Sequence, residues 1–150
     1  MKLSTRSRYG LKAVIDLAIS YGEGPVSLPV LASAQGISEG YLEQLLRELK
    51  KGGVVDTTRG AQGGYELTTD PAKLTVQRVL TLLEGSTAIV DCVGTKNHNC
   101  GSACTCSARP LFLELQTRIN EVLVRTTIRE LADDYLQQKS RGIQAKNCCE

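Results

Sequence analysis

Four of the six cysteines fall in one short segment, between Cys92 and Cys106. This segment reads Cys-Val-Gly-Thr-Lys-Asn-His-Asn-Cys-Gly-Ser-Ala-Cys-Thr-Cys, with no helical or strand period and with several residues that favour turns. A connection of this length without regular structure is uncommon in a compact domain unless it has a function. We therefore predict a loop at residues 86–107 whose sulfur atoms converge on one point, between a compact domain and a helical arm.

The residues before the loop predict a helix-turn-helix. Ser27 and Ser38 are suited to cap two successive helices, and Gly36 stands between them as a stop. In the second helix, leucines and polar residues occupy opposite faces at 3.6-residue spacing. The apolar face carries Leu42, Leu45, Leu46 and Leu49, and the polar face carries Gly40, Glu43, Gln44, Arg47 and Lys51. In such a motif the second helix lies in the DNA major groove.

A β-hairpin is predicted next, because residues 54–58 and 65–68 are rich in β-branched and aromatic side chains. The run between them, Arg59-Gly-Ala-Gln-Gly-Gly, is typical of the flexible tip of a wing. Arg59 at its root can enter a narrow minor groove, although a lone hairpin arginine is more often simply solvated. With a first helix capped by Ser4 or Thr5 and a fourth capped by Thr75, residues 1–85 are predicted to form a winged-helix domain.

The first helix is predicted to bury one apolar stripe against the rest of this domain. Its members fall at i, i+3, i+4 and i+7, namely Leu11, Val14, Ile15 and Ala18.

Residues 108–140 are predicted to form a helical arm. An apolar stripe runs along its first helix in steps of four and three residues, through Leu111, Leu115, Ile119, Val122 and Thr126. Near-3.5 spacing on an arm beyond a completed core favours burial against a second copy, and therefore a two-fold homodimer. Thr127 and Glu130 predict a capping box for a last helix that can fold back on the first domain. Residues 141–150, with Cys148 and Cys149, form a polar tail.

Composition excludes several classes of protein. The formal net charge of +2 is too small to imply a nucleic-acid partner by itself, and the single Phe and absent Trp argue against a base-stacking platform. No run of 18 apolar residues exists, so a cytoplasmic protein is the default expectation. In that reducing compartment clustered cysteines are more often metal ligands or redox thiols than disulfides. A thiol redox enzyme is disfavoured because no C-x-x-C motif accompanies a βαβ pattern.

The spacing of the loop cysteines favours one kind of metal group. Thiolates select zinc, copper(I) or iron-sulfur clusters. Zinc is possible but disfavoured, because Cys104 and Cys106 are one residue apart and the C-x2-C knuckles of structural zinc sites are missing. A [2Fe-2S] cluster tolerates irregular spacing and non-cysteine ligands. His98, the only histidine, becomes a minor ligand candidate because it lies inside the loop. Free thiols are the remaining alternative.

Several runs of residues resemble one family. They are Ser4-Thr-Arg-Ser-Arg-Tyr-Gly-Leu, Ile37-Ser-Glu-Gly-Tyr-Leu-Glu-Gln-Leu, Arg59-Gly-Ala-Gln-Gly-Gly-Tyr-Glu-Leu, Leu83-Glu-Gly and the cysteine loop. Together they resemble the bacterial winged-helix transcription regulators of the IscR/NsrR/CymR family over nearly the whole chain. The resemblance implies a mainly α fold with a small β-wing, a winged helix-turn-helix domain and a long C-terminal dimerisation helix. It also implies a cytoplasmic homodimer that binds palindromic promoter DNA.

The branches of this family differ in what they sense. In the IscR branch a labile [2Fe-2S] cluster reports iron-sulfur status and changes promoter choice, and NsrR uses its cluster to sense nitric oxide. CymR-like members lack the cysteines and sense cysteine metabolism through a partner enzyme. The cysteine loop therefore favours the cluster-bearing branch. The aspartate ligand of NsrR has no match here, since the nearby position is Arg8, which weighs against a nitric oxide sensor of that design.

The resemblance carries over to individual cysteines. The three-cysteine pattern of the IscR branch is matched by Cys92, Cys100 and Cys106. The fourth ligand of that branch is a histidine three residues after the last cysteine, and Arg109 stands at that place and cannot ligate. Cys104 is the first candidate for the fourth ligand, His98 is the second, and a residue from elsewhere in the dimer is the third.

The resemblance also assigns the DNA contacts. The promoter-reading pair of the family is present as Glu43-Gln44, and the wing arginine as Arg59. The predicted DNA-contacting set is Ser38, Gly40, Tyr41, Glu43, Gln44, Arg47 and Arg59. The resulting prediction is a homodimeric regulator, not an enzyme, that senses iron-sulfur status through a [2Fe-2S] cluster and controls iron-sulfur cluster assembly genes. A nitric oxide or redox sensor on the same scaffold, and a cluster-free regulator of cysteine metabolism, are the alternatives.

Overall fold

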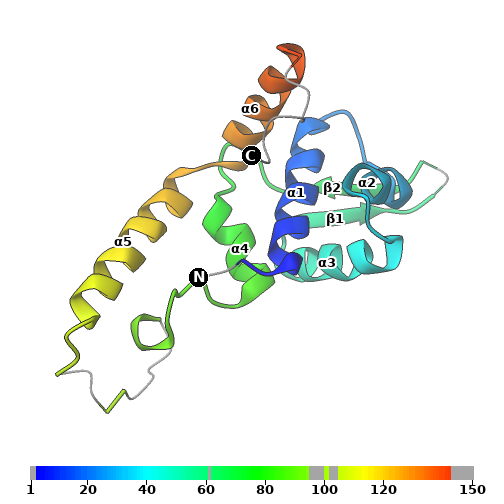
Figure 1. The fold of residues 1–150 in the computed structure, drawn as a ribbon. Coiled ribbons are helices and arrows are strands. Elements are labelled where there is room, and N and C mark those ends of the chain that lie inside the picture. The colour runs from blue at the N-terminus through cyan, green and yellow to red at the C-terminus, as the bar shows by residue number, and fades with distance from the viewer. Residues whose placement is uncertain (1–2, 61, 95–99, 102–104, 143–150) are drawn as a thin grey trace.

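The computed structural model describes residues 3–60, 62–94, 100–101 and 105–142. In this part of the chain helices predominate, and two short strands pair in one antiparallel sheet (Figure 1). The elements in chain order are α1 (Thr5–Ile19), α2 (Leu28–Gln35), α3 (Glu39–Lys51), β1 (Val55–Thr58), β2 (Gly64–Leu67), α4 (Val76–Glu84), the 3-10 turn η1 (Asp91–Val93), α5 (Arg109–Arg125) and α6 (Ile128–Ser140). This order confirms the predicted fold class, a mainly helical protein with a small β-wing.

The helix boundaries follow from local capping chemistry. Ser38 and Thr75 each occupy an N-cap, where the side-chain oxygen accepts a hydrogen bond from the backbone N–H three residues on. Thr127 and Glu130 form the predicted capping box. Ser27 also occupies an N-cap, but its hydroxyl makes no capping hydrogen bond. Pro29 explains this in part, because it removes one of the backbone donors that a cap would satisfy.

The core lies where α1, α3 and α4 pack together, and Val55 of β1 and Leu67 of β2 contribute to it. The leucine face of α3 is buried as predicted, since Leu42, Leu46 and Leu49 have no exposed surface. The buried stripe of α1 differs from the predicted one: Ala13 and Leu17 are buried, whereas Leu11 and Ile15, two of the expected members, are only partly buried. The reason is that α1 packs against several elements and so buries more than one stripe.

The small sheet carries the wing. Val55 pairs with Leu67 and Thr58 with Gly64 in an antiparallel register. The observed strands, 55–58 and 64–67, are each offset by one residue from the predicted ends. Beyond β2, Val26 forms an isolated bridge with Tyr65 through two backbone hydrogen bonds of 2.8 Å. A Cβ on Gly64 would collide with the carbonyl group of Val26, so only glycine fits this close approach.

The C-terminal helices take different positions. Figure 1 shows α5 extending away from the body of the molecule, whereas α6 returns beside α1. The return is anchored because Ile128 and Ala132 are buried in the core, and the Ile128 N–H donates to the Leu74 carbonyl at 2.8 Å. The expectation that the last helix folds back on the first domain is thus confirmed. Among the described residues, no helix is both long and apolar enough to span a membrane.

Candidate nucleic-acid interface and cysteine loop

The outward face of α3 presents polar groups to solvent. Glu43, Gln44 and Arg47 are exposed on this face, and Gly40 is exposed one turn earlier. Glu43 and Arg47 form an ion pair of 3.5 Å across one helical turn. An exposed pair at this spacing is worth only about 0.3–0.5 kcal/mol, so either partner can exchange it for a group outside the protein. The face therefore offers one acceptor, one amide and one guanidinium within two helical turns.

The N-terminal half of α1 flanks this face. Tyr41 is partly buried and makes an edge-to-face contact with Tyr9, with ring centroids 6.3 Å apart. Arg6 lies 4.0 Å from Glu48, and a cavity of about 220 Å³ opens between the two helices. Its lining includes Arg6, Tyr41, Gln44, Leu45, Arg47 and Glu48. The structure thus places Arg6 of α1 beside Gln44 and Arg47, two of the residues predicted to contact DNA.

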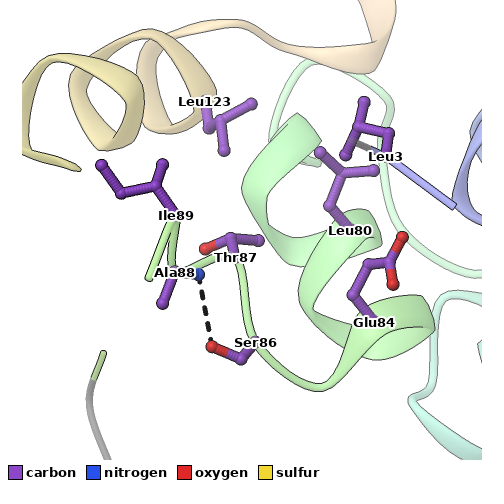
Figure 2. Close-up of a pocket in the computed structure, with 8 residues that line it drawn as sticks. All are labelled: Leu3, Leu80, Glu84, Ser86, Thr87, Ala88, Ile89 and Leu123. Atoms are coloured by element: carbon purple, nitrogen blue, oxygen red, sulfur yellow. Dashed lines mark hydrogen bonds between the residues drawn. The ribbon is translucent and has the colours of Figure 1, made fainter. Parts of the chain in front are cut away.

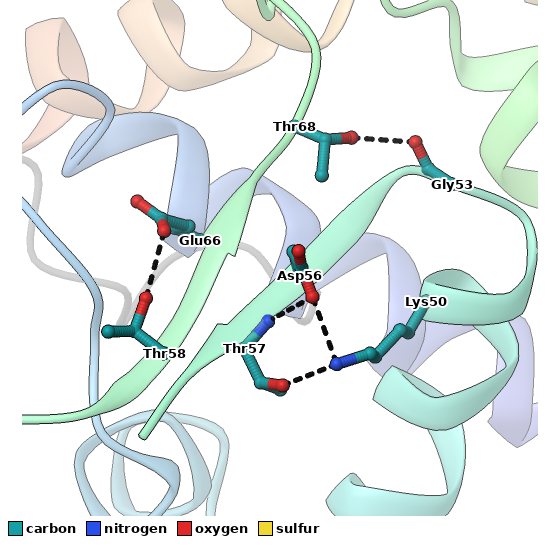
Figure 3. Close-up of polar contacts among 7 residues, drawn as sticks. All are labelled: Lys50, Gly53, Asp56, Thr57, Thr58, Glu66 and Thr68. Atoms are coloured by element: carbon teal, nitrogen blue, oxygen red, sulfur yellow. Dashed lines mark hydrogen bonds and ion pairs between the residues drawn. The ribbon is translucent and has the colours of Figure 1, made fainter. Parts of the chain in front are cut away.

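The wing is fixed to α3 at its root. Lys50, in the last turn of α3, forms a 2.9 Å ion pair with Asp56 on β1 and hydrogen bonds to Thr57 (Figure 3). The hydrogen bond from Lys50 holds the pKa of the Asp56 carboxyl below its ordinary value. On the other side of the hairpin, the Thr58 hydroxyl donates to Glu66 at 3.1 Å. The Lys50 contacts attach the hairpin to the end of α3, and the Thr58–Glu66 bond links the two strands.

Arg59 lies at the hairpin root and is exposed. Gly60 follows it with φ +120°, a conformation that side chains rarely adopt, and a Cβ on Gly63 would collide with the Thr58 carbonyl oxygen. The tight turn therefore needs glycine at both positions. Because this turn follows Arg59 directly, Arg59 stands at the start of the wing tip, immediately after β1.

Two of the three described cysteines, Cys92 and Cys106, lie at the start of α5. Cys92 is part of η1 and is partly buried, Cys106 precedes α5 and is partly buried, and Cys100 is exposed. All three have free thiols. Cys104 and His98, the two candidates for a fourth ligand, lie outside the described residues, as do Cys148 and Cys149. Within the described ranges, no three His, Cys, Asp or Glu side chains are grouped so that they could hold a metal ion.

Arg109 connects the two partly buried cysteines. Its guanidinium Nη1 donates to the Cys92 carbonyl oxygen at 3.0 Å. Its backbone N–H donates to the Cys106 carbonyl oxygen at 3.3 Å. The position that the family resemblance assigns to a histidine ligand is therefore occupied by a residue that binds the backbone of the first and last cysteines of the loop.

Gln116 is a functional candidate that sequence reasoning missed. It is the most buried residue of α5, with 8% of its surface exposed. Its Oε1 accepts from the Ile89 N–H at 2.8 Å, and its Nε2 donates to Asn120 at 2.9 Å and to the Thr87 carbonyl at 3.4 Å. The sequence pattern that could have identified Gln116 is its spacing, because Arg109, Gln116 and Asn120 lie seven and four residues apart and so share one face of the helix.

A cavity of about 290 Å³ lies behind this segment, between α4 and α5 (Figure 2). Leu80 lies on one side of it and Ile89 and Leu123 on the other. At its edge, the Ser4 N–H donates to the Glu84 carboxylate at 2.9 Å. Hydrogen bonding from Ser4 holds the pKa of Glu84 below its ordinary value. The first residues of the cysteine loop are therefore attached to α5 by hydrogen bonds, with an incompletely filled space of mixed polar and apolar lining behind them.

This chain is similar in sequence and in structure to known transcriptional regulators. A model of the Rrf2 family, described as iron-dependent transcriptional regulators, matches residues 3–134. The HTH-type transcriptional regulator CymR of Bacillus subtilis is 38% identical over 132 residues, which cover 88% of this chain and 90% of that protein. Its solved structure, titled the global cysteine regulator of that organism, matches with a TM-score of 0.75 over 89% of this chain and 97% of that chain.

IscR proteins are similar to a comparable degree. The HTH-type transcriptional regulator IscR of Aliivibrio salmonicida is 36% identical over 141 residues, covering 93% of this chain and 83% of that protein. The solved structure of T. potens IscR is 35% identical and matches with a TM-score of 0.72, over 97% of this chain and 93% of that chain. The resemblance found in the sequence is thus confirmed, and the relatives are transcriptional regulators rather than enzymes.

Proposed function

Because the chain belongs to the Rrf2 family of iron-dependent transcriptional regulators, we propose that it is a homodimeric DNA-binding protein whose cysteine loop holds a [2Fe-2S] cluster. In this proposal it senses iron-sulfur status in the cytoplasm and controls iron-sulfur cluster assembly genes. The observation that carries the proposal is the attachment of the cysteine loop to α5 through Arg109 and Gln116, on a scaffold that presents a polar recognition helix and wing.

The DNA contact is proposed for α3 and the wing. Glu43 and Gln44 are exposed where they can read base edges in a major groove, because a carboxylate accepts from cytosine and an amide pairs with adenine. The Ser38 hydroxyl is engaged in capping, so it positions the helix start, where backbone N–H groups suit a phosphate. A Cβ on Gly40 would meet open space, so packing does not require glycine there, and close approach of DNA accounts for it.

The remaining members of the interface act by charge and position. Arg47 and Arg59 are exposed cations that can contact phosphates or a narrow minor groove. Tyr41 is held against Tyr9 and so has a fixed position at the edge of α3. Positioning contacts and reading contacts are therefore assigned to different residues of one surface.

Dimerisation is proposed through α5. Several large apolar side chains of this helix are exposed, with Leu111 57% and Val122 50% accessible. Burying each such side chain is worth roughly 1.5–3 kcal/mol, which a second copy of the helix can supply. Leu115, 44% exposed, extends the same stripe. The dimer needs no metal in this proposal.

The donor chemistry of the loop fits the proposed cluster. Cys92, Cys100 and Cys106 supply three thiols that are not consumed in disulfides, and Cys104 or His98 would complete the set. When bound, a [2Fe-2S] cluster supplies one-electron redox chemistry. The chain itself contributes the soft ligands, the hydrogen bonds that hold Cys92 and Cys106, and a connection from the loop to α4 and α5.

Metal analysis of protein purified without oxygen tests this proposal. We expect iron and acid-labile sulfide in equal amounts, and loss of both when Cys92, Cys100 or Cys106 is changed to alanine. Cys104→Ala decides the fourth ligand. If this variant retains iron and sulfide, His98 or another residue must be the fourth ligand. Stoichiometric zinc without sulfide would contradict the cluster.

A second candidate, a cluster-free regulator of cysteine metabolism, is favoured by the 38% identity to CymR of Bacillus subtilis, whose structure is titled a global cysteine regulator. Promoter binding by the wild type and by a variant in which all four loop cysteines are alanine separates the two. Identical affinity and site preference of both proteins would favour the cluster-free candidate.

A further inference from the structure

One residue touches both ends of the cysteine loop. Arg109 uses its side chain for the carbonyl of Cys92 and its backbone for the carbonyl of Cys106. Cys92 lies 17 residues before Arg109, so this side-chain bond closes a loop that contains all four clustered cysteines. Closing a flexible loop of this length costs entropy, and a guanidinium hydrogen bond offsets part of that cost before any ligand binds.

The same face of α5 holds the chain on the N-terminal side of Cys92. Gln116 lies two helical turns after Arg109 and binds the backbone of Thr87 and Ile89. The chain from Thr87 to Cys92 is therefore attached to α5 at two places, a buried amide and a guanidinium. Only the second of these carries a charge.

We propose that Arg109 is a positioning residue for the cluster-binding cysteines: it holds Cys92 near Cys106 and brings a permanent positive charge to the cysteine loop. An arginine is charged at every physiological pH. It is not a ligand, because a guanidinium has no acceptor. The inference has two halves. The electrostatic half, the effect of the charge on a bound cluster, rests on the proposed function. The positioning half, which concerns the distance between Cys92 and Cys106, does not.

The charge has a predictable consequence. A [2Fe-2S] group bound by thiolates is anionic, and reduction adds one further negative charge, so a neighbouring cation favours the reduced form. Arg109→Gln keeps a hydrogen-bond donor and removes the charge, whereas Arg109→Lys keeps the charge. The two variants therefore separate the electrostatic effect from the hydrogen bond.

The positioning half is tested on cluster-free protein with a short bis-alkylating thiol reagent, with the linked peptides identified by mass spectrometry. We expect the yield of Cys92–Cys106 links to fall at least threefold in Arg109→Ala. Arg141→Ala is the matched control, because Arg141 is an exposed arginine at the end of α6, remote from the loop end of α5 (Figure 1), and it should leave the yield unchanged. An unchanged yield in Arg109→Ala would overturn the positioning role.

The electrostatic half is tested by potentiometric titration of the reconstituted protein. Arg109→Gln should lower the equilibrium constant for reduction about tenfold, a shift of about 59 mV to more negative potential for one electron, and Arg109→Lys should stay within threefold of wild type. Equal potentials for wild type and Arg109→Gln would overturn the electrostatic role. If the wild type binds no iron and sulfide, the proposed cluster fails, and the cross-linking result still decides whether Arg109 positions the cysteines.

Discussion

Replacing Gln116 by leucine should detach the first residues of the cysteine loop, at Thr87 and Ile89, from α5. Leucine has a similar volume but no polar group, so the Ile89 N–H, the Thr87 carbonyl and Asn120 each lose a partner. The Ile89 hydrogen bond, 2.8 Å long and partly buried, is the strongest of the three. A buried donor left unsatisfied costs about 1–3 kcal/mol, and the added apolar surface of leucine offsets part of this. We expect a net loss of about 1–2 kcal/mol.

Urea unfolding of cluster-free protein at one fixed concentration measures this loss, because dimer stability depends on concentration. Hydrogen exchange should also show faster exchange at the Ile89 amide, while the amides of α3 keep their protection. Gln138→Leu, at an exposed position of α6, is the matched control for the change of side chain. Wild-type stability together with unchanged exchange at Ile89 would refute the assignment of Gln116 as the anchor.

Four further outcomes are expected. Glu43→Ala should keep or raise affinity for DNA but relax discrimination by about 1–3 kcal/mol at one base pair per half-site, measured by titrating promoters that vary there. Arg59→Ala should weaken binding to every cognate site and reduce the slope of log affinity against log salt by about one. Leu115→Lys should dissociate the proposed dimer, as measured by light scattering, whereas Thr117→Lys on the same helix should not. A stable Leu115→Lys dimer would show that the interface lies elsewhere. Glu84 has a folded pKa below its unfolded value of about 4.3, so it stabilises the fold above that value and loses its contribution as pH falls through the folded pKa. Glu84→Gln should remove this part of the acid dependence, and an unchanged pH profile of unfolding would contradict it.

The proposed DNA surface is divided into positioning and reading residues according to how each side chain is held. The Ser38 hydroxyl is committed to the helix cap and Tyr41 to an aromatic contact, so both have fixed geometry. Glu43 and Arg47 share only a weak exposed ion pair and are available to a partner. Substitutions at the first two should therefore perturb the start of α3, whereas substitutions at the last two should change DNA binding without destabilising the fold.

Much of this protein could be predicted from sequence because the deciding interactions are local. The caps at Ser38, Thr75 and Thr127 join atoms three residues apart, and the leucine face of α3 repeats at the helical period, so both are visible in a short window. The family resemblance depended on runs of adjacent residues for the same reason. The stripe of α1 was wrong in part because periodicity shows which residues share a face but not how many faces a helix buries.

The sequence by itself determined the helices, the wing, the polar outer face of α3 and the concentration of thiols in one loop, since each depends on residue type and short spacing. Only the tertiary structure decided what holds that loop. The partners of Arg109 and Gln116 lie 17 and 27 residues away in the chain, and α6 reaches α1 across most of the chain. Contacts at such separations follow from how the packed helices bring distant backbone groups together, and no local pattern of residues encodes that proximity.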